Sequence, residues 1–450
     1  MVWLRRSRPI STLRRATRES IMSIHETPRR APWAGRRLST ALWAAVRIVS
    51  VGGVAACNSI ADSLLSVELP TRVDASNLNN PQLAPLMAQS ATADFECALV
   101  NYAAATGTFV DEFIGSTGWA AYTAWDTRRV FSDNFNLGQG TCIAFGWGVY
   151  QSLQTARFQA EDGSRRIQAF ADADVPGKTS LLATLSAYAG YSYVLLGEGF
   201  CRVAIDLGPA MTPAQVFAVA EQRFTDAIAL AQASGNTPML NLALVGRARA
   251  RLDLGKKPEA AADAALVPQG FTLNATYSGV TERRFNRIYV QNQREFYISV
   301  HPSFRNLTFG GVPDPRVPVT DAGRNGHDGV TRVWFEQKYK SDGDPIPIAT
   351  WQEAQLIIAE VQGGQPAVDA INLIHTAAGL PAFSSSDPNE IAQQVLEERR
   401  RQFFLDGHRL GDMLRLGIPF ETGTTLLGIP YASTTCLPLP DAEAKNNPNI

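Results

Sequence analysis

Apolar residues recur at helical spacing through most of the chain, and this pattern predicts a mostly α-helical protein. Glycine and proline interrupt the pattern at short intervals, so successive helices are expected to fold back on one another as hairpins. A clear example is one apolar helix face, formed by Val216, Ala220, Phe224, Ile228 and Ala231. The predicted helices span residues 83–113, 142–159, 180–198, 213–233, 238–254, 258–266, 351–360 and 367–378.

Two of these groups, residues 180–266 and 351–378, have the character of stacked helical hairpins. Residues 248–261 resemble the turn of a tetratricopeptide repeat, where small residues let two helices approach closely. Gly190 and Ala248 are expected at such close approaches.

Other segments break the helical pattern. Residues 161–164, Glu-Asp-Gly-Ser, predict a polar turn. Residues 269–348 are rich in Gly, Pro, Asn and Thr, with short alternating runs at 287–290 and 330–335, and predict loops and β-hairpins. The expected architecture is therefore helical hairpins with an irregular, minor-β region.

The last 64 residues, 387–450, carry the densest signals. Asp387 can cap a helix with Pro388 at its first position, and Glu390 follows three residues after the cap. The charge run at 397–401 is expected to be solvated or structurally paired. Gly407 permits a left-handed stop, after which Arg409, Asp412 and Arg415 are spaced for charge pairing on a second short helix.

The beginning of the chain predicts export. Val54-Ala-Ala-Cys57 matches a bacterial lipobox, preceded by an apolar run and by eleven arginines against two glutamates. Residues 1–56 are therefore predicted to be a lipoprotein signal peptide, and Cys57 the lipidated residue. Either Met1 or Met22 can serve as the start.

Without this leader the chain has 394 residues, enough for one large or two intimately packed domains. It keeps 30 basic and 40 acidic residues, a net charge of about −10, which disfavours nucleic-acid binding. No segment after Cys57 has the pattern of a transmembrane helix.

The exported part retains four cysteines, Cys97, Cys142, Cys201 and Cys436. Disulfides are permitted in an exported chain, and four cysteines allow three pairings. We favour Cys97 with Cys142 and Cys201 with Cys436, with free buried thiols as the alternative.

The sequence offers little for catalysis. The histidines after the leader are far apart, and HExxH, GxSxG, P-loop and GxGxxG motifs are absent. We therefore predict a non-enzymatic protein that needs no cofactor and holds no dedicated metal. Asp342-Gly-Asp344 and Asp328-Gly329 leave calcium open, although Asp-Gly is first of all a turn signal.

Aromatic residues are concentrated between residues 113 and 158, which suggests recognition of a ligand. Sugar rings pack on aromatic faces, and their hydroxyls need polar partners. In the predicted loop 115–129, Trp119, Tyr122 and Trp125 are expected to be exposed, with Trp334 and Tyr339 as lesser candidates; Trp147 and Tyr150 are expected in the core.

The order of charge, aromatic pair and glycine in residues 395–415, with residues 434–440 and the terminal Asn-Asn-Pro-Asn, resembles the signature of the SusD/RagB family of nutrient-binding lipoproteins. The resemblance implies a tetratricopeptide-like scaffold anchored by lipid to the outer membrane and facing outward. It also implies capture of oligosaccharides, or in some members peptides, for a SusC-like TonB-dependent transporter.

A helical-repeat adaptor or assembly lipoprotein with no small ligand is the alternative. In such a protein the aromatic residues would form a protein interface. A solvent-facing aromatic cleft would favour nutrient capture, whereas a cleft filled with packed side chains would favour the adaptor.

Overall fold

The computed structural model describes residues 77–142 and 147–450. These residues belong to a single unit of the chain. The predicted signal peptide and the lipidation candidate Cys57 lie outside the described residues, so both stay predictions.

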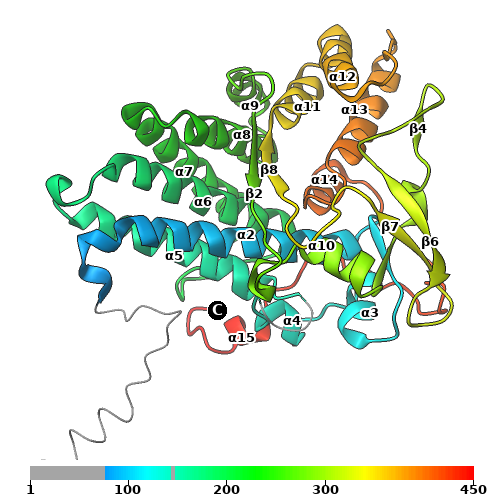
Figure 1. Ribbon diagram of the computed structural model, residues 1–450, viewed down its shortest axis with the longest axis horizontal. Coiled ribbons are helices and arrows are strands. Elements are labelled where there is room, and N and C mark those ends of the chain that lie inside the picture. Colours follow the sequence, from blue (N-terminus) through cyan, green and yellow to red (C-terminus); the bar gives the residue numbers. More distant parts are fainter. Residues whose placement is uncertain (1–76, 143–146) are drawn as a thin grey trace, which may run out of the picture. The chain divides into compact units, whose positions relative to one another are not determined.

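A stack of helices forms the larger part of the fold and confirms the mostly α-helical class (Figure 1). Long α2 packs against α5 and α6, and α6 to α9 then pack one after another as antiparallel hairpins. Among the described residues, no helix combines the length and the apolar character needed to span a bilayer. This stack comprises α2 (Ala84–Phe109), α5 (Tyr150–Ala169), α6 (Lys178–Gly199), α7 (Pro213–Ser234), α8 (Thr237–Asp253) and α9 (Lys257–Ala264).

Small residues let the hairpins pack closely, as predicted for Gly190 and Ala248. The ring of Phe224 on α7 lies between Gly190 on α6 and Gly246 on α8. A Cβ atom would come within 2.7 Å of that ring at position 190 and within 2.3 Å at position 246, so neither site tolerates a side chain without movement. Ala248 is fully buried in the same core.

The C-terminal helices form a second group, and α13 begins as predicted. The Asp387 side chain accepts the Asn389 backbone N–H, and Pro388 occupies the first helical position. Gly407 adopts φ 90°, as predicted, and α14 follows. This group comprises α11 (Trp351–Gln362), α12 (Gly364–Ala378), α13 (Pro388–Gln402) and α14 (Arg409–Leu416).

The charge run on α13 is structurally paired rather than solvated. Glu398 is buried and contacts His375 at 2.8 Å and the guanidinium of Arg316. Arg399 binds both carboxylate oxygens of Asp412, at 2.6 and 2.9 Å. These pairs join α13 to α12, α14 and the strand region, so the run fixes tertiary structure.

The strand region consists of four two-stranded antiparallel sheets. The predicted strand at 330–335 is present as β7. The pairs are β1 (Phe113–Gly115) with β3 (Ile298–Val300), β2 (Thr272–Ala275) with β8 (Ile346–Thr350), β4 (Thr308–Phe309) with β5 (Val312–Pro313), and β6 (Val319–Asn325) with β7 (Arg332–Glu336).

Three local predictions are wrong. The predicted polar turn at 161–164 lies inside α5, which begins at Tyr150 rather than at residue 142. Arginines form ion pairs with its acidic residues; Glu161, for example, pairs with Arg157 and Arg223.

The other two wrong predictions concern segments that are helical. The predicted loop 115–129 contains α3 (Ala120–Asp126). The alternating run 287–290 forms α10 (Arg287–Tyr289), which is capped by Asn286. The described residues also contain two more short α-helices, α4 (Phe135–Gly138) and α15 (Asp441–Ala444).

Two disulfides join the four cysteines in the favoured pairing. Cys97 on α2 is bonded to Cys142, and Cys201 after α6 is bonded to Cys436 near the C-terminus, with Cα atoms 5.9 and 5.3 Å apart. The second bond closes a loop of 235 residues and fastens the C-terminal segment to the helical stack.

Candidate functional site

The predicted aromatic cluster divides into one exposed and two buried residues. Trp119 is 48% exposed and precedes α3 as its N-cap residue. Tyr122 and Trp125 are 2% and 0% exposed, so their predicted exposure is wrong. Because they lie three residues apart on α3, both face the core, where their rings meet Trp147 edge-on at 5.0 and 5.7 Å.

The second aromatic group divides in the same way. Trp334 on β7 is half-buried, and the guanidinium of Arg305 lies over its ring at 5.1 Å. Tyr339 is buried, so its predicted exposure is wrong; its hydroxyl donates to the Leu405 carbonyl at 3.3 Å. Trp147 and Tyr150 are buried, as predicted.

Trp119 belongs to an aromatic surface that sequence reasoning did not find. Its ring lies 5.1 Å from that of half-buried Tyr297, and the ring of exposed His327 lies 5.3 Å from that of Tyr297. Ser116 joins the three segments, because its N–H donates to the Tyr297 carbonyl and its carbonyl accepts the Asp328 N–H. The residues come from parts of the chain about 180 and 200 positions apart, so no local pattern connects them.

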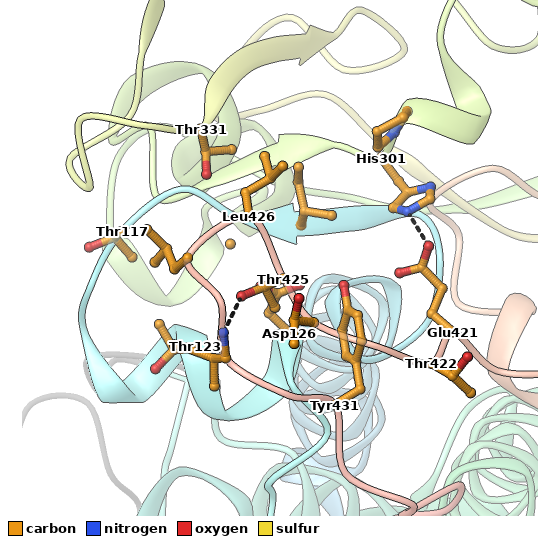
Figure 2. Close-up of a pocket in the computed structure, with 16 residues that line it drawn as sticks. Thr117, Thr123, Asp126, His301, Thr331, Glu421, Thr422, Thr425, Leu426 and Tyr431 are labelled. Atoms are coloured by element: carbon orange, nitrogen blue, oxygen red, sulfur yellow. Dashed lines mark hydrogen bonds and ion pairs between the residues drawn. The ribbon is translucent and has the colours of Figure 1, made fainter.

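A hollow of ≈ 210 Å³ opens in the same region, and Thr117, two residues before Trp119, lines it (Figure 2). Its lining comes from β1, α3, the residues after β3, Thr331 before β7, and the segment 421–431. Hydroxyl groups dominate the polar part of this lining: Thr117, Thr123, Thr331, Thr422, Thr424, Thr425 and Tyr431. Ile114, Leu426, Leu427 and Ile429 supply apolar surface. Leu426 is one of the most exposed large apolar side chains of the described residues.

The side chain of Arg128 holds the C-terminal wall of the hollow, residues 421–431, in place. One nitrogen of Arg128 donates to the carbonyls of Glu421 and Ala432, at 2.6 and 2.8 Å. Its guanidinium also lies 5.5 and 5.0 Å from the ring centres of Phe420 and Tyr431. The guanidinium is therefore directed at backbone and rings and does not line the hollow.

The ionisable groups in the hollow are two carboxyls, an imidazole and a phenol. Burial, which is the largest effect, raises the pKa of Asp126 to about 7. His301 contacts a carboxylate oxygen of Glu421 at 2.9 Å, and that hydrogen bond lowers the pKa of Glu421 (Figure 2). Burial raises the pKa of Tyr431. The hollow can thus offer hydrogen-bond donors and acceptors together with an acidic side chain.

Within residues 77–142 and 147–450, no three His, Cys, Asp or Glu side chains gather in a way that could hold a metal ion. The Asp-Gly segments left open for calcium form turns. Asp328 accepts the backbone N–H groups of Val330 and Thr331, and Asp344 accepts that of Lys340.

His408 in the C-terminal signature has a structural environment. Its ring stacks on Phe403 with centroids 4.2 Å apart, and its Nδ1 contacts Asp406 at 2.8 Å. It is buried away from the lining of the hollow.

Comparison with known proteins supports the resemblance found in the sequence. The SusD family matches residues 353–449. A curated relative, the starch-binding protein SusD of Bacteroides thetaiotaomicron, is 31% identical over 169 residues. That alignment covers 32% of this chain and 30% of the relative, so it spans less than a third of the relative's length.

Solved structures share the fold over nearly their whole length. A SusD homolog from Bacteroides thetaiotaomicron is 14% identical with a TM-score of 0.65, covering 85% of this chain and 98% of that one. A SusD-like carbohydrate binding protein from Bacteroides vulgatus is also 14% identical, with a TM-score of 0.60 over 82% and 97% of the two chains. At this level of identity the likeness shows the fold alone.

Proposed function

The chain is a SusD/RagB family protein, and from that premise we propose that it captures oligosaccharides at the hollow beside Trp119. The observation that carries this proposal is a hollow lined by hydroxyl groups, with exposed Trp119 two residues after Thr117 of its lining. An aromatic face stacks on the C–H face of a sugar ring, and threonine hydroxyls exchange hydrogen bonds with sugar hydroxyls. The names of two relatives, starch-binding and carbohydrate binding, point in the same direction.

The exposure of Trp119 also supports nutrient capture over the adaptor alternative. An adaptor would be expected to present a broad apolar face, whereas the hollow combines a concave shape with polar groups. Peptides remain a ligand class to include in the screen, because threonine and carboxyl groups also bind backbone amides.

The proposal extends to the membrane. We place the protein at the outer membrane, anchored through lipidated Cys57 and facing outward, where it delivers its ligand to a SusC-like TonB-dependent transporter. The lipobox at residues 54–57 supports the anchor, and the family supports the partner. Binding of the ligand requires no cofactor in this proposal.

Replacement of Trp119 by alanine is expected to weaken glycan binding by roughly five- to thirtyfold, since loss of an aromatic stacking surface costs on the order of 1–2 kcal/mol. Stability should change little, because the ring is 48% exposed. Calorimetric titration with the ligands found in a glycan and peptide screen, together with thermal melts, measures both effects.

Phe158→Ala is the matched control. Phe158 on α5 is 46% exposed but does not line the hollow, so its removal should leave affinity unchanged. Equal affinities of wild type and Trp119→Ala would contradict the proposed site. A screen without any glycan or peptide ligand would favour the adaptor.

Replacement of Cys57 by alanine is expected to release the protein from the membrane fraction, because the acylated cysteine is the proposed anchor. Membrane fractionation in a strain without the transporter tests this directly. Sedimentation of the variant with the outer membrane would show that another segment holds the protein there.

A further inference from the structure

The charges around the hollow narrow the class of sugar that fits it. We propose that the hollow recognises a sugar residue bearing a free ammonium group, with Asp126 as its partner, and that it disfavours acidic sugars. This inference rests on the proposed function and specifies the ligand class of the same site.

Asp126 is a buried carboxyl without a cationic partner. It is the last residue of α3 and lines the hollow. Its carboxyl lies so close to Gly115 that a Cβ atom added to this glycine would come within 3.2 Å of Asp126 Oδ2. Across residues 77–142 and 147–450, no Lys, Arg or His forms an ion pair with it. Its position at the C-terminal end of a helix disfavours negative charge and favours a nearby cation.

The groups that act on Asp126 from neighbouring elements are mostly acidic. Burial is the largest effect on its pKa, and the charges of Glu421 and Asp328 add to the increase, which brings the pKa to about 7. The Gly115 backbone N–H and the charge of Arg128 act in the opposite direction. Arg128, however, is already engaged with two carbonyls and two rings.

The carboxylate of an acidic sugar would lie close to these carboxyl groups. The lining holds no lysine or arginine that could form an ion pair with it. The charge of such a sugar would be desolvated beside like charges, which is unfavourable. An ammonium group would instead form a charge-assisted hydrogen bond with Asp126, while the threonine hydroxyls bind the rest of the ring. Because an ammonium favours the ionised carboxyl, binding should release protons from Asp126.

Four β-1,4-linked tetrasaccharides test the charge preference on one backbone: those of glucosamine, N-acetylglucosamine, glucose and mannuronic acid. Calorimetry at pH 7 with the mature chain should give the glucosamine tetramer at least about tenfold higher affinity than the glucose tetramer, and no binding of the mannuronic acid tetramer. Titrations in buffers of different ionisation enthalpy should be run at about pH 5.5, where the amines of the ligand are already charged and the Asp126 carboxyl, with its pKa of about 7, is still protonated. They should show proton release with the glucosamine tetramer and none with the glucose tetramer.

Asp126→Asn should reduce the affinity ratio between the glucosamine and glucose tetramers to near one and abolish the proton release. Glu421→Gln, at a half-exposed carboxyl paired with His301, should lower the ratio less and provides a second variant if Asp126→Asn is unstable in melts. A ratio near one in wild type, a ratio unchanged by both variants, or preference for the mannuronic acid tetramer overturns this inference.

Binding of none of the four tetramers also overturns it. The proposed function is decided separately, by the wider screen and by Trp119→Ala. A protein that binds neutral glycans without charge preference would therefore retain the function and lose this inference.

Discussion

Removal of the Cys201–Cys436 disulfide is expected to lower the free energy of unfolding by about 5 kcal/mol, since the entropy of the unfolded chain rises with the length of the closed loop. The loop spans 235 residues, more than half of the chain. Backbone contacts hold the same two segments together in the folded state: the Cys201 N–H donates to the Leu437 carbonyl at 2.9 Å, and the Leu437 N–H donates to that of Gly199 at 2.8 Å. The folded structure should therefore survive the change, with the effect concentrated in the unfolded chain.

The measurement is chemical denaturation of the Cys201→Ala/Cys436→Ala double variant. Cys97→Ala/Cys142→Ala is the matched control, because its loop of 45 residues predicts a smaller loss of about 4 kcal/mol. Wild type should also lose stability on addition of reductant. A denaturation midpoint unaffected by reductant, or titratable thiols at all four of these cysteines in the purified protein, would contradict the prediction.

Replacement of Arg249 by methionine is expected to cost about 3–5 kcal/mol of folding stability, because it leaves buried carboxylates without their cation. Arg249 on α8 binds both oxygens of Glu198 on α6 at 2.6 Å. Both side chains are buried, and a carboxylate oxygen of Glu353 on α11 lies 3.9 Å away. One guanidinium thus connects the hairpin stack with the C-terminal helices.

Arg294→Met is the matched control, because it removes an ion pair that is exposed to solvent. Arg294 binds both oxygens of Asp342 at 2.9 and 3.1 Å, but its side chain is 39% exposed. Its loss should cost no more than about 1 kcal/mol. Similar denaturation midpoints for the two variants would mean that the buried pair contributes no more than a surface pair.

The helices of this protein are encoded locally. Capping residues, prolines and apolar spacing are close in sequence, so α7, α8, α11 and α13 could be predicted within a few residues of their ends. The failures have tertiary causes. α5 continues through Glu161-Asp-Gly-Ser164 because Arg223 on α7 binds Glu161, and because Gly163 packs against Leu185 on α6.

The candidate site shows the limit of local reasoning most clearly. The sequence identified Trp119 as an aromatic residue suited to binding, but only the fold separated it from Tyr122 and Trp125, since exposure depends on what α3 packs against. The sequence could not predict that Trp119 contacts Tyr297, or that Asp126 and Glu421 line the same hollow. Those partners lie about 180 and 300 residues apart in the chain.

The sequence by itself determined the helical class, the family resemblance and the caps of the main helices. These depend on signals within a few residues or on a recognisable motif. Only the tertiary structure decided which aromatic rings meet solvent, which charges of the C-terminal signature are buried, and which segments enclose the hollow. Burial and long-range contact are properties of the packed chain, so they are set by the surroundings of a residue and not by its neighbours in sequence.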